Sequence, residues 1–395
     1  MKLKAVKFLT AAAIYSVVAL AAAQDIKIAL IMSKTGAFEV YAKQSEYGLK
    51  LGLEYATQGT MKINGRSVVI LYKDDQLKPD RARALIEEAF KDDGADIAVG
   101  STSSANTLAM MPVAEEMKKL LVVEVAGADS ITGDKWNRYV VRTGPNVTQG
   151  SSGSAMAVSE KGTQVATLAQ DYAFGREGVA AFKRAVTKAG GIIVAEEYAP
   201  ISTTDFTAPV ERIFNALKDK PGKKKLWVSW IGPSPMAKIN AMNPGRYGIE
   251  LSTLGTALPA MSALKDIPNL EGAMFYYYDM IKNGPNDWLV TEHKKRHGTP
   301  PDAGTAVAFN AGIAIVEAVK KANGTDTAKL ISAFEGMNFD GATGPIHIRK
   351  EDHQAMHSIY HVKFTTVPGV EWAVPQLIRK LPADQIDIPI LNKRN

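Results

Sequence analysis

A cluster of small hydroxyl residues follows a short apolar segment, ADIAVG, that ends at Gly100. Serine and threonine in such a position fit either a hydrolase nucleophile or a set of hydrogen-bond donors that holds an anion. The nucleophile is the weaker interpretation, because the chain has no Gly-x-Ser-x-Gly turn and no nearby histidine and aspartate partners can be assigned. We therefore expect an anion site at the start of the helical stretch after Ser104.

Such a site would use the unpaired N–H groups and the positive dipole end of that helix. Ser103, Ser104 and Asn106 would add side-chain donors to a ligand carboxylate. The competing explanation for the same residues is helix capping, which serine and asparagine often perform. Both alternatives predict a strand before the cluster and a helix after it.

The elements around this cluster alternate between short apolar runs and longer amphipathic ones. The segments IKIALIM, VVILYKDD, ADIAVG, LVVEVAG and RYVVRT are separated by helical stretches, and a similar series resumes after Gly144 and Pro145. This pattern predicts an α/β fold with parallel sheets flanked by helices, in two lobes. About 370 mature residues are also more than one hydrophobic core usually holds.

The last third of the chain breaks the alternation. After GAMFYYYDM come three predicted helices, around 288–296, 303–321 and 327–335, with no strand between them. We expect these helices to cover the first lobe and the strands PIHIRK and SIYHVKF to return to the second lobe. The tail from Pro368 is expected to be irregular surface structure.

The predicted domains follow from three crossings between lobes, which together make a hinge. Residues 24–143 with 281–343 are expected to form lobe 1, and residues 144–280 with 344–395 to form lobe 2. Residues 1–23 have lysines followed by an apolar run ending in three alanines, which is typical of a secretory signal peptide.

The composition limits the compartment and the partners. The chain has no cysteine, hence neither disulfides nor a lipid-bearing cysteine after the signal, so we expect a freely diffusing periplasmic protein and not a lipoprotein. Its 47 basic and 41 acidic residues include three lysines of the signal, and no basic face is visible. Nucleic acid is therefore not an expected partner.

Six segments resemble one known family in the family's own order. They are IKIALIMSKTGAFEVYAKQSEYGLKLGLEYA, YKDDQLKPDRA, VGSTSSANTLAMMPVAEE, DYAFGREG, DFTAPVERI and GATGPIHI. Together they are similar to the Leu/Ile/Val-binding type of periplasmic solute-binding protein, which serves ABC importers for branched-chain and hydrophobic amino acids. The resemblance implies a two-lobe fold of periplasmic binding protein type I with three crossovers, without catalytic activity or a cofactor.

The resemblance also implies where a ligand binds. Ser104 falls at the family's carboxylate-binding serine, beside Ser103, and Ala126 and Ala128 fall on the facing loop, where backbone groups would meet the ligand. Three aromatic residues are candidates for closing over the ligand, although buried aromatic residues are more often core. They are Tyr41, Phe174 and Trp230.

One position departs from the family pattern. Amino-acid binders of this type place an acid near the segment STLGTALPA, where this chain has Thr256 and Ala257. A buried ammonium without a partner is costly, so an α-amino acid is disfavoured unless Asp129 or Asp279 replaces that acid. The sequence favours an aromatic or otherwise apolar carboxylate as the ligand.

Four histidines near the end raise the question of a metal site. His347, His353, His357 and His361 lack the spacing of a compact site, so we expect surface histidines and no metal.

The predicted function is capture of a small carboxylate by cleft closure and its delivery to a membrane permease by a monomeric receptor. A branched-chain amino acid is the alternative ligand. A sensory binding protein and a periplasmic hydrolase are the alternatives from other classes.

Overall fold

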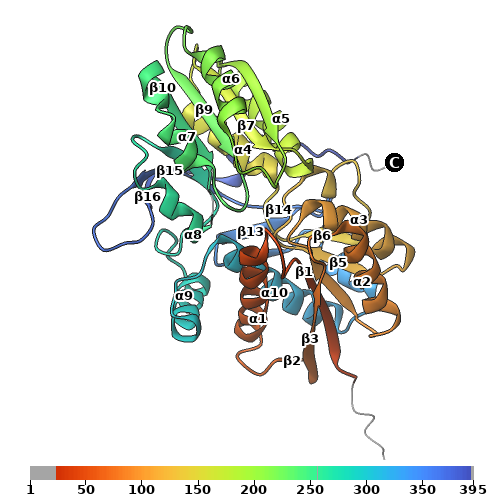
Figure 1. Ribbon diagram of the computed structural model, residues 1–395. Coiled ribbons are helices and arrows are strands. Elements are labelled where there is room, and N and C mark those ends of the chain that lie inside the picture. Colours follow the sequence, from red (N-terminus) through yellow and green to blue (C-terminus); the bar gives the residue numbers. More distant parts are fainter. Residues whose placement is uncertain (1–23, 256, 393–395) are drawn as a thin grey trace, which may run out of the picture.

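The computed structural model describes residues 24–255 and 257–392, which form two α/β lobes (Figure 1). The predicted signal peptide, residues 1–23, lies outside the described residues. Each lobe is built on its own sheet, and a three-stranded sheet accompanies the first lobe. The predicted two-lobe α/β fold class is confirmed.

The sheet of the first lobe is formed by apolar strands that are parallel apart from one short edge strand. The strands are β1 (Ile26–Met32), β2 (Lys62–Ile63), β3 (Arg66–Asp74), β4 (Ile97–Gly100), β5 (Leu120–Val123) and β6 (Val140–Arg142). Their order is β2-β3-β1-β4-β5-β6, with β2 antiparallel to β3. The order reverses at β1, and in open α/β sheets ligands bind beyond the carboxyl ends of the strands at such a point.

Helices cover both faces of this sheet, because alternate side chains of each strand point to opposite sides. Ile28 and Leu30 pack in the core shared with α1, α10 and α11, whereas Ala29 and Ile31 pack with α2 and α3 (Figure 1). The helices are α1 (Glu39–Ala56), α2 (Pro79–Lys91), α3 (Ser104–Glu116), α9 (Gly284–His297), α10 (Ala303–Ala322) and α11 (Thr327–Phe334), with a 3₁₀ turn η1 at Asp129–Ile131. The three predicted helices after residue 280 are thus present as α9, α10 and α11.

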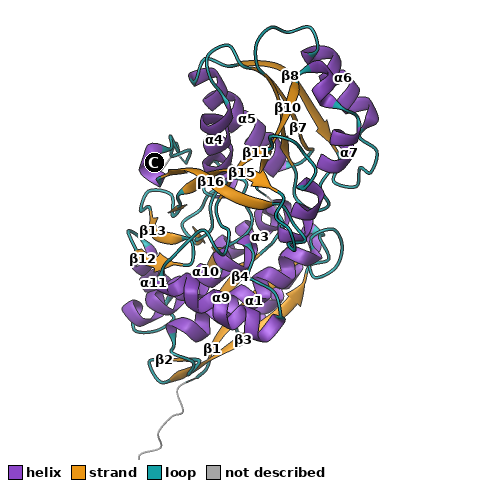
Figure 2. Ribbon diagram, turned by 90° about the vertical axis from the view of Figure 1, so that its left-hand side faces the viewer, coloured by secondary structure: helices purple, strands orange, loops and turns teal. Residues whose placement is uncertain are grey.

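The second lobe repeats this arrangement and adds two antiparallel strands. Its strands are β7 (Gln164–Gln170), β8 (Ile192–Ala199), β9 (Lys224–Ser229), β10 (Ile249–Leu254), β11 (Glu271–Met274), β15 (Ile359–Thr365) and β16 (Val374–Leu381). Their order is β16-β15-β11-β10-β9-β7-β8. Helices α4 (Val147–Val158) and α5 (Ala173–Lys188) cover one face, and α6 (Thr207–Leu217) and α7 (Met236–Ala241) the other (Figure 2).

Short elements complete the chain. They are the helix α8 (Leu258–Met261), the 3₁₀ turns η2 (Pro244–Tyr247), η3 (Ser262–Leu264) and η4 (Ala383–Gln385), and the strands β12 (Asn338–Gly341), β13 (Gly344–Ile348) and β14 (Ala355–Met356).

Two expectations for the C-terminal part are wrong. The strand at 344–348 does not return to the second sheet, because β13 pairs with β12 and β14 and its Ile346 and Ile348 are buried in the core of the first lobe. The tail is not irregular throughout, because Val374–Leu381 forms β16 on β15. The chain therefore passes between the two main sheets from β6 to α4, from β11 to α9 and from β14 to β15.

Helices α1 and α10 pack with their backbones in close contact. A Cβ on Gly48 would lie 2.2 Å from the Thr305 carbonyl oxygen, and one on Gly52 would lie 2.1 Å from that of Phe309. On α10, a Cβ on Gly312 would lie 2.7 Å from the Leu53 nitrogen. Helix α10 is long and apolar enough to cross a membrane by composition, but 83% of that stretch is buried inside the protein. It is the core helix of the first lobe.

We expect Gly52→Ala to lower the free energy of unfolding by about 1 to 3 kcal/mol, because the added methyl would force α1 and α10 apart. The control is Gly284→Ala at the start of α9, where a Cβ would meet nothing within 4 Å. Urea denaturation followed by circular dichroism measures both. Equal effects of the two substitutions would contradict the close contact of α1 and α10.

Candidate ligand-binding cleft

A cavity lies between the lobes, at the carboxyl ends of strands from both sheets. The empty space there is about 710 Å³, a volume that includes space open to solvent. Lobe 1 contributes residues after β5 and from α1 and α10, and lobe 2 contributes residues from α4, α5 and the ends of β9, β10 and β11. The lining residues are Tyr41, Gln44, Glu124, Val125, Gly127, Pro145, Asn146, Val147, Phe174, Ile231, Leu254, Gly255, Ala257, Phe275, Ala303, Gly304 and Val307.

Aromatic rings from both lobes form much of the cavity wall. Tyr41 stands on α1, Phe174 on the first turn of α5, and Phe275 directly after β11. Phe174 packs on the backbone of the first lobe, since a Cβ on Gly127 would lie 3.0 Å from its ring. The Tyr41 hydroxyl accepts a hydrogen bond from the Gly232 N–H at 3.3 Å. The rings therefore also hold the two lobes against each other.

Glu124 brings a buried carboxyl group to the cavity. It follows β5, is fully buried, and accepts a hydrogen bond at Oε1 from the Ser45 hydroxyl of α1 at 2.5 Å. Its Oε2 has no hydrogen-bond partner within the described part of the chain. Burial raises the pKa of Glu124 to about 7.

Gln44 and Asp302 form a second polar group that spans the lobes. Gln44 donates to Asp302 Oδ2 at 2.9 Å and accepts from the Gly304 N–H at 3.0 Å. Asp302 also accepts from the Leu258 N–H of the second lobe at 2.7 Å. Burial raises the pKa of Asp302 to about 6. These bonds fix the Gln44 amide at the edge of the cavity.

The hydroxyl cluster after β4 is buried and internally bonded. Ser101 and Ser33 both donate to the buried Asp75 carboxylate at 2.6 Å. Ser104 accepts from the Ala128 N–H at 3.1 Å. Ser103 occupies the N-cap position of α3 but makes no capping hydrogen bond with its side chain, so the capping explanation fails for it. Asn106 is fully buried and neither of its amide atoms has a partner among the described residues.

A buried arginine organises the facing loop. Arg142, at the end of β6, donates to the carbonyl oxygens of Ala126 and Ala128 and to the side chains of Thr132 and Gln354. Burial lowers the pKa of Arg142 to about 10. The guanidinium thus connects the first crossing, the cavity loop and the segment before the third crossing.

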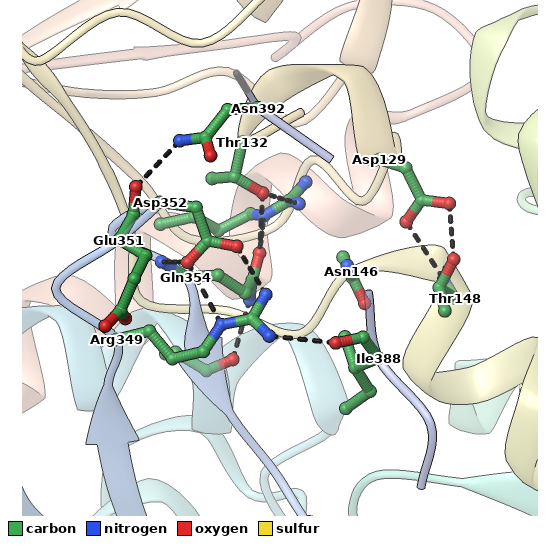
Figure 3. A network of polar contacts seen from close by, with 12 residues as sticks. Asp129, Thr132, Asn146, Thr148, Arg349, Glu351, Asp352, Gln354, Ile388 and Asn392 are labelled. Atoms are coloured by element: carbon green, nitrogen blue, oxygen red, sulfur yellow. Dashed lines mark hydrogen bonds and ion pairs between the residues drawn. The ribbon is translucent and has the colours of Figure 1, made fainter. Parts of the chain in front are cut away.

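Figure 3 shows how this network continues. Arg349 forms an ion pair with Asp352, and Arg349 also donates to the Ile388 carbonyl oxygen at 2.9 Å. Asn392 donates to the Glu351 carbonyl oxygen at 2.8 Å. The C-terminal residues that follow β16 are therefore bonded to the segment between β13 and β14.

The structure brings together only some of the predicted site residues. Tyr41, Phe174 and Ala257 line the cavity. Five others are buried beside it without lining it, and their contact with a ligand stays a prediction. They are Ser103, Ser104, Ala126, Ala128 and Trp230. Trp230 packs edge-on against Phe206, with ring centroids 5.0 Å apart.

Neither proposed substitute for the ammonium partner lines the cavity. Asp129 accepts from the backbone and hydroxyl of Thr148 at the start of α4 (Figure 3). The Asp279 side chain is 69% exposed and paired with Lys282. Thr256 lies outside the described residues. The acid that does line the cavity is Glu124, which the sequence analysis missed.

The prediction of surface histidines holds only for His347. The other three histidines are buried, and hydrogen bonds offset the cost of burying their polar ring atoms. His353 bonds to the Val140 carbonyl and Glu335, and His357 bonds to the Thr143 carbonyl and Thr343. His361 bonds to Glu271. Burial lowers the pKa of His357 to about 4. Within the described ranges, no group of three His, Cys, Asp or Glu residues could hold a metal ion.

The missed cavity residues had weak sequence signals. Glu124 alone had a direct one, since an acid immediately after the fully apolar strand LLVV stands where a ligand site is expected. Gln44 looks like an ordinary helix residue, Asn146 looks like an ordinary helix N-cap, and Phe275 looks like one of a run of aromatic residues in FYYY.

Two α/β lobes joined by three crossings, with a cavity between the carboxyl ends of their strands, define a solute-binding protein of the periplasmic type I fold. The chain belongs to the periplasmic binding protein family, whose pattern matches residues 25–367. Members of this family are receptors of ABC importers that bind small molecules and interact with permeases, so the predicted family is confirmed.

Comparisons with individual proteins agree with this family assignment. The chain is 57% identical to a solved ABC-type branched-chain amino acid transporter protein of Rhodopseudomonas palustris CGA009, with a TM-score of 0.84 over 94% of this chain and 100% of that one. It is 27% identical to a solute-binding protein of R. palustris BisB5 in complex with 3,4-dihydroxybenzoic acid, with a TM-score of 0.79 over 91% and 98%. It is also 27% identical to Leu/Ile/Val-binding protein homolog 6 of Brucella melitensis, over 89% of this chain and 91% of that protein.

We expect Arg142→Gln to lower the free energy of unfolding by about 2 to 4 kcal/mol, because buried carbonyl groups of the cavity loop lose their donor. The matched control is Arg138→Gln at an exposed position of the same lobe, which should change stability by less than about 0.5 kcal/mol. Chemical denaturation measures both. An Arg142 variant as stable as the control would contradict the organising role of the guanidinium.

Proposed function

We propose that this solute-binding protein captures an aromatic or otherwise apolar carboxylate. The observation that carries the proposal is the composition of the cavity wall, in which Tyr41, Phe174 and Phe275 stand among small and aliphatic residues. Burial of about 150 Å² of an aromatic ring contributes roughly 4 kcal/mol, about half of what micromolar binding requires. Hydrogen bonds to a carboxylate supply a further contribution.

The relative from R. palustris BisB5, at 27% identity, supports the aromatic ligand, since its structure holds 3,4-dihydroxybenzoic acid. Backbone N–H groups of the cavity loop around Gly127, which lines the cavity, would donate to the carboxylate of such a ligand, and a contact with Ser104 stays a prediction. Among the described lining residues there is no lysine, arginine or histidine. Recognition of the carboxylate thus depends on hydrogen bonds and not on an ion pair.

A branched-chain amino acid is the second candidate. The 57% identical protein of R. palustris CGA009 is described as a branched-chain amino acid transporter, and Glu124 offers a buried acid inside the cavity. In this case Glu124 would be ionised and would pair with the ligand ammonium. The two candidates differ in the charge that they bring to Glu124.

The remaining features of the proposal concern the whole protein. The pattern of residues 1–23 supports export through a cleavable signal peptide, and the lack of cysteine supports a protein without a lipid anchor. We propose a monomer that closes over its ligand by hinge motion and delivers it to a membrane permease, without enzymatic activity. The alternative partner is a sensory receptor, to which the closed form would bind.

Calorimetry with a panel of acids tests the ligand class. We expect benzoate, 4-hydroxybenzoate or 3,4-dihydroxybenzoate to bind, and leucine, isoleucine and valine to bind at least about tenfold more weakly, a difference of about 1.4 kcal/mol. 4-Methylpentanoate, which is leucine without its amine, should bind more tightly than leucine. Micromolar binding of leucine with no binding of the aromatic acids would support the second candidate instead.

Phe174→Ala should weaken binding of the preferred aromatic acid by about 1 to 3 kcal/mol, because it removes a ring that faces the ligand. Tyr72→Ala, at a half-exposed position on β3 away from the cavity, is the matched control and should leave affinity unchanged. Unchanged affinity in the Phe174 variant would contradict the proposed location of the ring.

A further inference from the structure

Glu124 is the one acidic side chain among the described residues of the cavity wall. Its carboxyl group accepts a hydrogen bond at Oε1 from the Ser45 hydroxyl of α1 at 2.5 Å. The other oxygen, Oε2, is buried and has no partner within the part of the chain that the structure describes. A buried oxygen without a partner, on a residue that lines a ligand cavity, points to a bond that the ligand completes.

Among the described residues, no positive group forms an ion pair with Glu124. Of the other described cavity-lining residues only Tyr41, on α1, is titratable, and α4, α5 and the ends of β9, β10 and β11 contribute none. Beyond the lining, three charged or titratable groups bond to Gln44, to the cavity loop or to the first crossing: Asp302, Arg142 and His357. None of these makes an ion pair with Glu124.

Each of these three groups forms its hydrogen bonds with residues other than Glu124. Asp302 accepts from Gln44 and from two backbone N–H groups. Arg142 donates to Thr132, Gln354 and the cavity loop. His357 bonds to Thr143 and Thr343, and burial lowers its pKa to about 4, which leaves it neutral. Burial therefore raises the pKa of Glu124 to about 7, although its hydrogen bond with Ser45 acts in the opposite direction.

A ligand carboxylate would bring a second negative charge into this site. Two carboxyl groups that share a water-poor site cannot both remain ionised at modest cost, so they share one proton. We propose that Glu124 binds the ligand carboxylate in its protonated form, donating a hydrogen bond from Oε2, so that capture of the ligand is coupled to uptake of a proton. This inference rests on the proposed carboxylate ligand and assigns a selectivity role to Glu124.

The proton has a defined source and place. When free Glu124 is ionised, solvent supplies one proton to Oε2 as the ligand binds, and no covalent bond to the ligand forms or breaks. Below about pH 7 free Glu124 already carries this proton, so affinity is constant down to the titration of the ligand itself. Above about pH 7 the ionised form must first be protonated, and affinity falls by up to about tenfold per pH unit.

Calorimetry with benzoate from pH 6 to pH 8.5 tests the coupling. We expect the dissociation constant of the wild-type protein to rise by about 10- to 30-fold across this range. Titrations at pH 8 in buffers of different ionisation enthalpy should report uptake of close to one proton per benzoate bound. 4-Methylpentanoate, an aliphatic acid, should follow the same profile.

Glu124→Gln gives the decisive comparison, because its amide keeps a donor without the charge. We expect this variant to bind benzoate with no pH dependence and no proton uptake, and to bind it at least tenfold more tightly than the wild type at pH 8.5. Glu124→Ala, which lacks any donor, should bind weakly at every pH. Glu177→Gln is the control, since burial raises the pKa of Glu177 too but its carboxylate bonds to the Ser130 N–H and not to the cavity.

The outcomes separate this inference from the proposed function. Benzoate binding with a flat profile, or with proton uptake that persists in Glu124→Gln, would overturn the role of Glu124 and leave the carboxylate ligand standing. Failure of both acids to bind at any pH would overturn the two together. Leucine binding that strengthens with rising pH and is lost in Glu124→Gln would identify Glu124 as an ammonium partner and would also overturn the inference.

Discussion

The buried guanidinium of Arg142 constrains the rest of the structure. A charged group with no exposed surface is tolerable only if its donors all find acceptors, and here the acceptors come from the cavity loop, from Thr132 and from Gln354. Gln354 in turn donates to the Gly144 carbonyl at the first crossing. These bonds fix the end of β6 to the loop after β5 and to the segment before the third crossing. The position of the cavity loop therefore depends on the segments that connect the lobes.

The cavity itself results from two sheets that present their carboxyl ends to each other. Apolar contacts between rings and backbone, and bonds such as those from Gly232 to Tyr41 and from Leu258 to Asp302, hold the lobes together around it. Most polar side chains at its edge are already satisfied by the protein. Among the described residues that line the cavity, Glu124 is the exception, because its buried Oε2 has no hydrogen-bond partner. This oxygen is the atom to which we assign a bond with the ligand.

Much of the fold follows from alternating apolar and amphipathic segments, which correctly predict both sheets and the helices α9, α10 and α11. Strands β13 and β16 were misplaced because strand partners depend on distant parts of the chain that periodicity does not report. At the site, the family resemblance singled out Tyr41, Phe174 and Ala257, which line the cavity and whose contact with a ligand stays a prediction. Glu124 was missed because the sequence does not show which residues surround an acid that follows a strand. Its importance becomes visible only in the structure, where the described lining of the cavity contains no lysine, arginine or histidine.

The C-terminal residues after β16 have a mechanical consequence. They pack on the second lobe through Ile386 and Ile388, yet Arg349 and Glu351 bond to them from the segment that accompanies the first lobe. These bonds join the two lobes at a place separate from the three chain crossings, so the proposed hinge motion would have to keep or break them. Under the proposed hinge motion, the strength of these C-terminal contacts would help to determine how widely the lobes separate when no ligand is bound.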